Sequence, residues 1–516
     1  MKLRRRAFLR ILAGAVAFLA GRPAPARAKT RVLEIHRATR NTLAGALDGL
    51  LSKLRRPPAR FKAYAGAERA KLPALRADPA LPLAEAVRHY APARGFREAP
   101  LSLAELGRLL YFTNGVTGRR GLHLRAAPSA GALYSGEVYV VAERVSGLPS
   151  GVYYYDVMGH ALVRVQAGSF TSQVADALER PGEIANVPVV ILLANVFHRY
   201  TWRYANRGYR YALIDSGHIG ENLRLSATSA GFGHAAPLRF HDDRLNAILQ
   251  VDGRAEAVCA VHLVGAPADG ATGSAVKRSL VERHSKGETP LREEVIERYH
   301  QATKLVDGDT ATPAPTDPVL PPTASPSSLA LPETSALPTT VVEESIQKRR
   351  SARHFEPDPI ALENLSFVLE MAQGPRALER APGVELYLAA HRVKDLAPGL
   401  YRYEAKAHRL APLREGDLTR ALVSACLGQE KAGAAAVAFL MVAKLTREAA
   451  RAGDRSYRDL LIESGAIGQR IYLSAESAGL AARNLAAFMD DELNELMGLD
   501  GQNEAVVHLT VVGHGD

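Results

Sequence analysis

The chain has 516 residues, of which 47% are hydrophobic and 23% are charged, and its formal net charge is +11. This length and composition predict a globular protein of two large domains. Seven of the positive charges lie in the first 28 residues with no acid among them, which leaves the remainder near +4 (11 − 7 = 4). The sequence therefore excludes the strongly basic surface typical of nucleic-acid-binding proteins.

Residues 1–28 have the pattern of an export signal. A basic start precedes an apolar run over residues 11–21, and Ala26-Arg27-Ala28 gives the small-x-small pattern of signal cleavage. The apolar run is shorter than the ~20 residues of a membrane-spanning helix, so no stable membrane anchor is expected. The stretch from Arg5 to Arg10 resembles a twin-arginine signal, although an ordinary secretory signal with extra arginines is the alternative. We expect a periplasmic protein, exported by the twin-arginine pathway.

The remainder of the chain is a duplication. With a shift of 248 residues, 215–265 aligns with 463–513 without a gap, and 22 of the 51 positions are identical. Such a repeat predicts two α+β domains, each with a central mixed or antiparallel sheet and flanking helices, packed as an intrachain pseudo-dimer. The predicted boundaries are an N-terminal helical extension over 29–87, a first domain over 88–304, a Pro/Ser/Thr-rich linker over 305–340 and a second domain over 341–516.

In chain order, each half is expected to form a strand, a compact turn unit, a second apolar strand, a long helix and a closing strand. Gly231 and Gly479 follow the two helices, where C-cap glycines are typical. The cysteines, Cys259 and Cys426, lie in apolar stretches, so one disulfide is conceivable. The expected segments are 136–143, 188–195, a helix containing 219–230 and 257–264 in the first half, and 385–390, 436–443, a helix containing 467–478 and 505–512 in the second.

Two short motifs carry the candidate chemistry. The run Pro128-Ser129-Ala130-Gly131 precedes the first strand, and its small residues allow backbone amides to approach a flat or anionic ligand. A tight turn is the plain alternative. The second half opens with Arg349, Arg350, Ser351 and Arg353, whose guanidinium groups and hydroxyl suit a phosphate monoester. A solvated basic turn is the alternative for that run.

Together these motifs resemble the nitroreductase superfamily of FMN-dependent oxidoreductases. The first half resembles its SagB-type branch, dehydrogenases that oxidise thiazolines and oxazolines in modified peptides. The resemblance covers most of 88–265 and 341–513, and residues 125–141, 151–156, 197–211 and 215–218 carry it. It implies that FMN is the cofactor and that hydride passes to or from an organic substrate. It further implies that the phosphate group of FMN contacts Arg349, Arg350, Ser351 and Arg353. The flavin ring is expected beside Pro128 to Gly131, and Gln429 and Arg125 are expected to make further contacts with FMN.

Each half lacks a different part of the family's flavin site. Under the 248-residue shift, the loop at 128–131 falls on 376–379, which reads Arg-Ala-Leu-Glu. Conversely, Tyr90-Ala91-Pro92 stands where Arg349-Arg350-Ser351 would be needed. We therefore expect a single composite FMN site, with its phosphate end in the second half and its ring loop in the first.

Arg203 and Tyr204 are the candidate catalytic residues. The resemblance leads us to expect a Lys-Tyr pair in azoline-oxidising relatives, but arginine remains protonated and cannot act as a general base. Arg203 could orient an anionic substrate, and Tyr204 could donate a proton. The substrate is expected to be a small molecule or a peptide, and the electron partner is open. Two alternatives are a flavin-free pseudoenzyme or ligand-binding module, and a SagB-type azoline dehydrogenase in peptide maturation.

Overall fold

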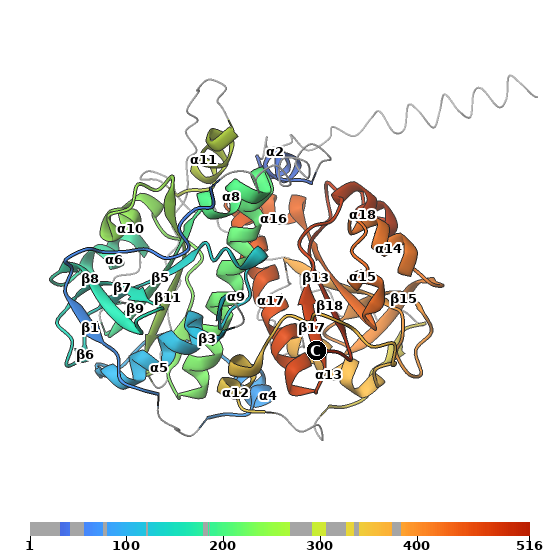
Figure 1. Ribbon diagram of the computed structural model, residues 1–516, viewed down its shortest axis with the longest axis horizontal. Helices are drawn as coiled ribbons and strands as arrows, with labels where there is room; N and C mark the ends of the chain where they lie inside the picture. Colours follow the sequence, from blue (N-terminus) through green and yellow to red (C-terminus); the bar gives the residue numbers. More distant parts are fainter. Residues whose placement is uncertain are drawn as a thin grey trace, which may run out of the picture.

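The structure is a computed structural model that describes residues 31–41, 56–75, 80–119, 122–178, 184, 186–268, 292–305, 327–334, 340–373 and 383–516. The predicted export signal over 1–28 lies outside the described residues. Figure 1 shows two lobes side by side, with the long helices α9 and α17 between them. Within the described ranges, no helix is long and apolar enough to cross a membrane.

The first lobe is built on a seven-stranded sheet with the order β1-β8-β7-β5-β9-β11-β10, in which all neighbouring strands are antiparallel. The central strands are rich in β-branched residues and are almost completely buried, as such residues favour. The strands are β1 Arg69–Lys71, β5 Gly136–Ala142, β7 Gly151–Asp156, β8 Ala161–Ala167, β9 Val189–Val196, β10 Gly233–Ala235 and β11 Glu256–Gly265, with the short β2 Leu101–Ser102, β3 Val116–Arg119, β4 His123–Arg125 and β6 Val145–Ser146 outside this sheet.

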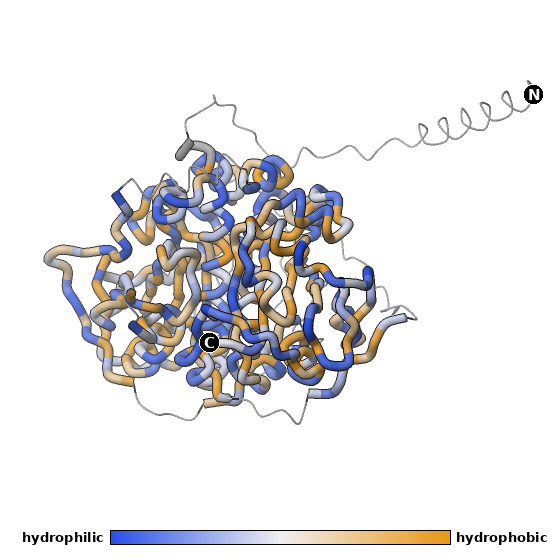
Figure 2. Tube along the Cα trace, turned by 45° about the vertical axis from the view of Figure 1, so that its right-hand side comes forward, coloured by the Kyte–Doolittle hydropathy of each residue, from blue (hydrophilic) through white to orange (hydrophobic). Residues whose placement is uncertain are grey.

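The second lobe repeats this sheet strand for strand. Its order is β12-β15-β14-β13-β16-β18-β17, again antiparallel throughout. Hydrophobic stretches run through both lobes in Figure 2. The predicted α+β pseudo-dimer is therefore confirmed, with antiparallel sheets. The strands are β12 Leu329–Ala330, β13 Val384–Ala390, β14 Gly399–Glu404, β15 Arg409–Glu415, β16 Val437–Ala443, β17 Ala481–Asn484 and β18 Ala505–Gly513.

Helices surround the sheets and meet between them. The helix α5 shows how local sequence sets a boundary: Ser102 caps it, and Glu105 completes a capping box. The helices are α2 Val32–Ala38, α4 Leu83–Arg88, α5 Leu103–Asn114, α6 Thr171–Leu178, α8 His198–Tyr204, α9 Gly208–Ser229, α10 Asp242–Leu249 and α11 Arg292–Ala302, then α12 Val342–Lys348, α13 Leu362–Gln373, α14 Thr419–Ala425, α15 Lys431–Ala434, α16 Leu445–Ala452, α17 Ser456–Ser477 and α18 Asp490–Met497.

The two long helices cross at a pair of equivalent glycines. A Cβ atom on Gly217 of α9 would lie 2.0 Å from the carbonyl oxygen of Ile462, and a Cβ atom on Gly465 of α17 would lie 2.0 Å from that of Ile214. Any side chain at either position would therefore push the two lobes apart. The expected C-cap glycines are also confirmed, since Gly231 and Gly479 have φ values of +77° and +70° directly after the helices.

Buried ion pairs join the lobes on both sides of this crossing. Nη1 of Arg207 lies 2.5 Å from one carboxylate oxygen of Asp490, and Nη1 of Arg210 lies 2.6 Å from the other. The same arrangement recurs with the halves exchanged and every residue moved by 248 positions: Asp242 receives Arg455 at 2.7 Å and Arg458 at 2.6 Å. The lobes are thus held by an interface that is symmetric in detail.

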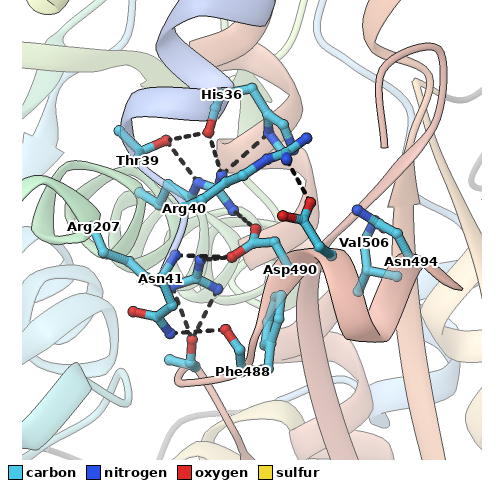
Figure 3. A network of polar contacts seen from close by, with 12 residues as sticks. His36, Thr39, Arg40, Asn41, Arg207, Phe488, Asp490, Asn494 and Val506 are labelled. Atoms are coloured by element: carbon cyan, nitrogen blue, oxygen red, sulfur yellow. Dashed lines mark hydrogen bonds and ion pairs between the residues drawn. The ribbon is translucent and has the colours of Figure 1, made fainter. Parts of the chain in front are cut away.

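A short N-terminal helix closes the interface over Asp490 (Figure 3). Thr39, just after α2, has its hydroxyl 3.0 Å from that of Tyr457, and the backbone N–H of Asn41 donates to Asp490 at 3.0 Å. On the first lobe, the residues that follow α11 make the equivalent contacts. Thr303 lies 3.3 Å from the Tyr209 hydroxyl, and the N–H of Leu305 donates to Asp242 at 3.0 Å. The helix α11 therefore occupies on the first lobe the place that α2 occupies on the second.

Three expectations need correction. Cys259 and Cys426 are both free and buried, so they form no disulfide. The extension over 29–87 is not purely helical, because it supplies the edge strand β1 of the first sheet. The linker over 305–340, where it is described, contains β12, which extends the second sheet beside β15 because its backbone completes the edge of that sheet.

Candidate functional site

The loop at 128–131 lies at the lobe interface and leads directly into a strained turn. Gly131 has a φ value of 61°, and Ala132 and Tyr134 after it have positive φ values of 53°, which side-chain-bearing residues rarely adopt. A Cβ atom on Gly131 would lie 2.5 Å from the hydroxyl oxygen of Tyr204, so glycine is required at this close approach. Strained backbone of this kind is typical of ligand-contacting segments, because the surrounding structure must maintain it.

A hydrogen-bond chain behind the loop provides that support. Ser129 Oγ accepts from the Tyr134 N–H at 2.9 Å and lies 2.6 Å from the Tyr200 hydroxyl. The Tyr200 hydroxyl in turn donates to the carboxyl group of Asp215 in α9. Burial raises the pKa of Asp215 to about 7. This carboxyl group therefore changes its protonation near neutral pH, and it is connected to the loop through two hydroxyl groups.

Both candidate catalytic residues lie against this loop. They are the last two residues of helix α8. The Tyr204 hydroxyl lies beside Gly131, and Nη1 of Arg203 would be 3.8 Å from a Cβ atom on Gly131. Burial raises the pKa of Tyr204 to about 12, so its hydroxyl keeps its proton at neutral pH. The ring of Tyr211 packs edge-on against Tyr204 at 4.9 Å, and its hydroxyl donates to the carbonyl of Ala486 in the second lobe. The pair therefore stands where the loop meets the opposite lobe.

Arg349 reaches from the second lobe to the segment that leads into the loop. Its Nε donates to the carbonyl of Ala126 at 3.0 Å and its Nη2 to that of Arg125 at 3.4 Å. The remaining nitrogen, Nη1, is buried and has no partner, and no described carboxylate lies within ion-pair distance of the side chain. Burial lowers the pKa of Arg349, and its guanidinium stacks over the ring of Tyr472 at 5.2 Å. An unsatisfied buried cation of this kind fits an anionic ligand.

The other three members of the basic motif lie beside Arg349 in sequence but make different contacts. Arg350 donates to the carbonyl of Thr117 at 2.8 Å, also across the interface. Ser351 is exposed, with its hydroxyl 2.9 Å from that of Tyr472. Arg353 is exposed, and its side chain makes no hydrogen bond or ion pair with any described residue. The motif thus combines two arginines bound to the first lobe with a hydroxyl and a guanidinium open to solvent.

Arg125 and Gln429 lie at different places from the basic motif. The Arg125 side chain is buried inside the first lobe, where it donates to the Gly136 carbonyl at 3.2 Å and lies over the ring of Tyr134. Both Nη atoms of Arg125 therefore donate to carbonyls of the first lobe and its N-terminal extension, while its buried Nε has no partner. Gln429 donates to the carbonyl of Ala487 at 2.6 Å, next to the residue that receives the Tyr211 hydroxyl. Gln429 and Tyr211 thus bind neighbouring carbonyls, and Tyr211 in turn packs against Tyr204.

Sequence reasoning did not assign three residues that the structure brings to this interface. Asp215 and Tyr200 support the loop from behind, as described. His218, one helical turn after Asp215, has Nε2 2.8 Å from the side-chain amide of Asn484 in β17, and its Nδ1 is buried without a partner. The available signal was the run Asp215-Ser216-Gly217-His218, in which Asp215 and His218 lie three positions apart and therefore on one face of the helix.

The equivalent position of the other half is built differently. In the second half, the arginine precedes the long helix and the aromatic ring lies on that helix, as Arg349 and Tyr472. In the first half this is reversed: the guanidinium of Arg224 in α9 lies over the ring of Tyr90 at 4.2 Å. Arg224 also pairs with Glu221, which receives Arg470 from the second lobe at 3.1 Å. These two arginines lower the pKa of Glu221 to about 2. The cation in this position is already neutralised by the protein's own carboxylate.

Comparison with known proteins agrees with the duplicated fold. The model of the nitroreductase family matches the chain twice, over residues 91–266 and 346–514. Two relatives are described as putative nitroreductases. MJ1384 of Methanocaldococcus jannaschii is 36% identical over 158 residues, which is 31% of this chain and 79% of that protein. A crystal structure from Anabaena variabilis has 25% identity and a TM-score of 0.73, covering 94% of this chain and all of that one.

A further relative is the trifolitoxin-processing protein TfxB of Rhizobium leguminosarum bv. trifolii. It is 29% identical over 150 residues, which is 28% of this chain and 40% of TfxB. The paired matches of the family model span both lobes. The chain therefore belongs to the nitroreductase family of oxidoreductases, with two copies of the family's domain in one polypeptide.

Proposed function

We propose that the protein is an exported FMN-dependent oxidoreductase with one composite flavin site between its two lobes. When bound, FMN would accept or supply a hydride at N5 of its ring, while the protein positions the substrate and the protons. The observation that carries this proposal is Arg349. It comes from the second lobe, bonds to the Ala126 carbonyl two residues before the loop at 128–131, and keeps one buried nitrogen unsatisfied.

The residues present fit such a cofactor at its phosphate end. Arg349 offers a buried unpaired N–H donor, and Arg353 and the Ser351 hydroxyl are open to solvent. Guanidinium groups bind phosphate through paired hydrogen bonds, and a hydroxyl adds a further donor. Arg350 would act indirectly, by holding this segment to Thr117 of the first lobe. Arg125 is left out of the proposed phosphate contacts, because its guanidinium is engaged inside the first lobe.

The ring end would lie beside Pro128 to Gly131. The small side chains of this loop and its fixed, strained backbone allow a planar group to approach closely. Tyr204 would hold a proton at its hydroxyl next to Gly131, and Gln429 would support the second lobe's side of the ring. The proposed roles are thus divided between the lobes, as a site shared by two subunits would be.

One cofactor per chain is expected rather than two. In the equivalent position of the other half, Tyr90 replaces the gripping arginine, and Glu221 neutralises Arg224 and Arg470. A phosphate placed there would have to compete with a buried carboxylate for both cations, which is electrostatically unfavourable. The asymmetry between the two positions therefore favours a single binding event.

A visible spectrum tests the proposal directly. The protein is purified from the cytoplasm without residues 1–28, and its bound flavin is quantified against protein concentration. We expect flavin absorption bands and about one FMN per chain. Two FMN per chain would contradict the composite site, and a protein that stays colourless after mixing with FMN would favour the flavin-free ligand-binding alternative.

The periplasmic location is part of the proposal and has its own test. Its support is the pattern of a basic start, a short apolar run and a small-x-small cleavage site over residues 1–28. Cell fractionation of the full chain and of an Arg5→Lys, Arg6→Lys variant would show the first in the periplasm and the second retained in the cytoplasm. Retention of both would overturn the export assignment.

Azoline oxidation in peptide maturation is a second candidate, because TfxB, a trifolitoxin-processing protein, is among the relatives. The feature against it is Arg203, which stands where the azoline-oxidising branch is expected to have a lysine that removes a proton. Incubating the flavin-loaded protein with thiazoline- and oxazoline-containing peptides decides between the two. Conversion by the native protein would favour the second candidate, and conversion only after Arg203→Lys would assign the loss to this residue.

A further inference from the structure

The duplication provides an internal reference for Arg203. Arg203 in α8 and Arg451 in α16 occupy equivalent positions under the 248-residue shift, each three residues after Tyr200 or Glu448. In the second lobe, Arg451 donates from Nε to the carboxylate of Glu448 at 2.7 Å and forms an ion pair with it. In the first lobe, Arg203 makes no hydrogen bond or ion pair with any described residue. One copy of the arginine is neutralised, and the other is not.

The unpaired copy is the one at the candidate site. Tyr200 stands in place of Glu448, and its hydroxyl is engaged with Ser129 and the Asp215 carboxyl group. The Arg203 guanidinium lies over the ring of Tyr204, 5.7 Å from its centroid, and close to Gly131. A half-exposed cation between an aromatic ring and a small-residue loop is a ready receptor for an anion.

A neighbouring residue extends this surface. Trp202 lies directly before Arg203 in α8 and is half-buried, and its indole nitrogen Nε1 is buried without a partner. An indole N–H normally finds an acceptor when it is buried. The cation and the tyrosine ring therefore lie together at the end of α8, with an unpaired indole donor on the preceding residue, and an aromatic carboxylate offers acceptors for the cation and a face for the ring.

We propose that the substrate accepted at this site carries a carboxylate group, which Arg203 receives beside the 128–131 loop. This inference rests on the proposed function, because it places the substrate at the same loop as the ring of the cofactor. A guanidinium binds a carboxylate through two parallel N–H···O bonds and so fixes its orientation as well as its position. Arg203 is then a specificity-determining residue, and its charge selects anionic over neutral substrates of the same shape.

The chain's single tryptophan makes the test independent of the cofactor. Since Trp202 is adjacent to Arg203, its fluorescence reports on binding at this place whether or not FMN is present. The purified protein is titrated with benzoate and with benzamide, its neutral counterpart of the same shape. We expect benzoate to give a saturable change and benzamide to bind at least about tenfold more weakly, which equals about 1.4 kcal/mol of discrimination.

Three variants complete the experiment. Arg203→Gln is expected to lose benzoate affinity at least tenfold and to retain its thermal midpoint, because the side chain makes no bond to a described residue. Arg203→Lys is expected to lose less, because it keeps the charge without the fork of donors. Arg451→Gln is the matched control at the equivalent position, and its benzoate affinity is expected to stay unchanged.

The outcomes separate the two proposals. Equal responses to benzoate and benzamide, an unchanged affinity in Arg203→Gln, or no saturable response in the native protein would each overturn the carboxylate assignment. FMN content is measured on the same samples by visible absorption. A protein that binds benzoate through Arg203 but retains no flavin would refute the proposed function alone, and a flavin-loaded protein that is indifferent to benzoate would refute this inference alone.

Discussion

Nη1 of Arg210 in the first lobe lies 2.6 Å from the carboxylate of Asp490 in the second, and both side chains are completely buried. The pair belongs to the exchanged set in which Asp242 receives Arg455 and Arg458. Because each carboxylate binds two arginines from the opposite lobe, these contacts fix the relative position of the lobes and hence of everything between them.

Removing one of these carboxylates should separate the lobes. In Asp490→Asn, two buried arginines lose their charged partner, and leaving a buried charge uncompensated costs about 3–5 kcal/mol. We expect a correspondingly lower free energy of unfolding in urea. Asp491→Asn is the matched control, because its side chain is 78% exposed and its pair with Arg40 should contribute less than about 1 kcal/mol. Equal stability of the two variants would mean that the interface pairs do not hold the lobes.

The helix crossing should be equally intolerant of added bulk. Gly217→Ala places a methyl group where the Ile462 carbonyl already lies, and overpacking of this kind costs about 1–3 kcal/mol or forces the helices apart. Urea unfolding measures the loss. Gly465→Ala is expected to give a similar loss because it is the equivalent contact, and a large difference between the two variants would show that the crossing is not symmetric in solution.

Asp215 should make stability depend on pH between about 4 and 7. Its pKa is about 7 in the folded protein and 3.8 when unperturbed, so the folded state binds more protons in that interval. The contribution of Asp215 to stability must then fall as pH rises from about 4 to 7, by up to about 1.4 kcal/mol per pH unit, and stay level above it. Burial lowers the pKa of several histidines, including His36, His218 and His300, and these contribute with the opposite sign in the same interval. Unfolding free energies of the native protein and of Asp215→Asn are measured from pH 4 to 8, and the native value minus the variant value should decline over this interval.

Two controls accompany that measurement. Glu463→Gln alters the equivalent helix position in the second lobe and should keep the slope of the native protein, because its neighbourhood lacks the Ser129 loop. Tyr200→Phe removes the hydroxyl that links Asp215 to Ser129 and should shift the midpoint of the transition. A difference between the native protein and Asp215→Asn that stays constant over this interval would show that Asp215 does not change its protonation there.

Flavin retention should depend on residues from both lobes. Arg350→Ala removes the contact with Thr117 that holds the basic segment, and Ser129→Trp breaks the hydrogen bond to Tyr200 behind the loop and displaces the loop. Each change alone should abolish retention of FMN, measured by visible absorption after gel filtration. Lys348→Gln, on the exposed side of α12, is the control and should retain it. If only one of the two variants loses flavin, the shared site is wrong.

Much of the fold could be predicted because the two halves of the chain can be aligned with each other. The 248-residue shift identified the central strands and the long helices, since two copies of one periodic pattern reinforce each other. That shift did not reveal the equivalence of α2 and α11, because these two helices are related by a shift of 264 residues. They share only the pattern His-x-Ala-Thr followed by a basic residue, at 36–40 and 300–304. The intervening insertions removed the common register.

The candidate site was predictable in its parts and less so in its contacts. The position of Arg349 next to the 128–131 loop agrees with the motif, but nothing in the sequence distinguishes an arginine that faces a ligand from one that binds backbone carbonyls. Arg125 is the example: the resemblance implied a contact with the flavin, and in the structure its side chain is buried and donates to the Gly136 carbonyl. Such choices are made by tertiary packing, which a local pattern does not contain.

The exchanged helices have a practical consequence for anyone dividing this chain. Cutting between 306 and 326 would leave α11 attached to the first lobe, whose surface it covers, while α2 would remain bound across the junction to the second. Two such pieces would remain associated through α2 and through the four buried arginines that cross the interface. We would expect them to copurify as a heterodimer. Either piece expressed alone would expose to solvent the surface that the other lobe normally covers.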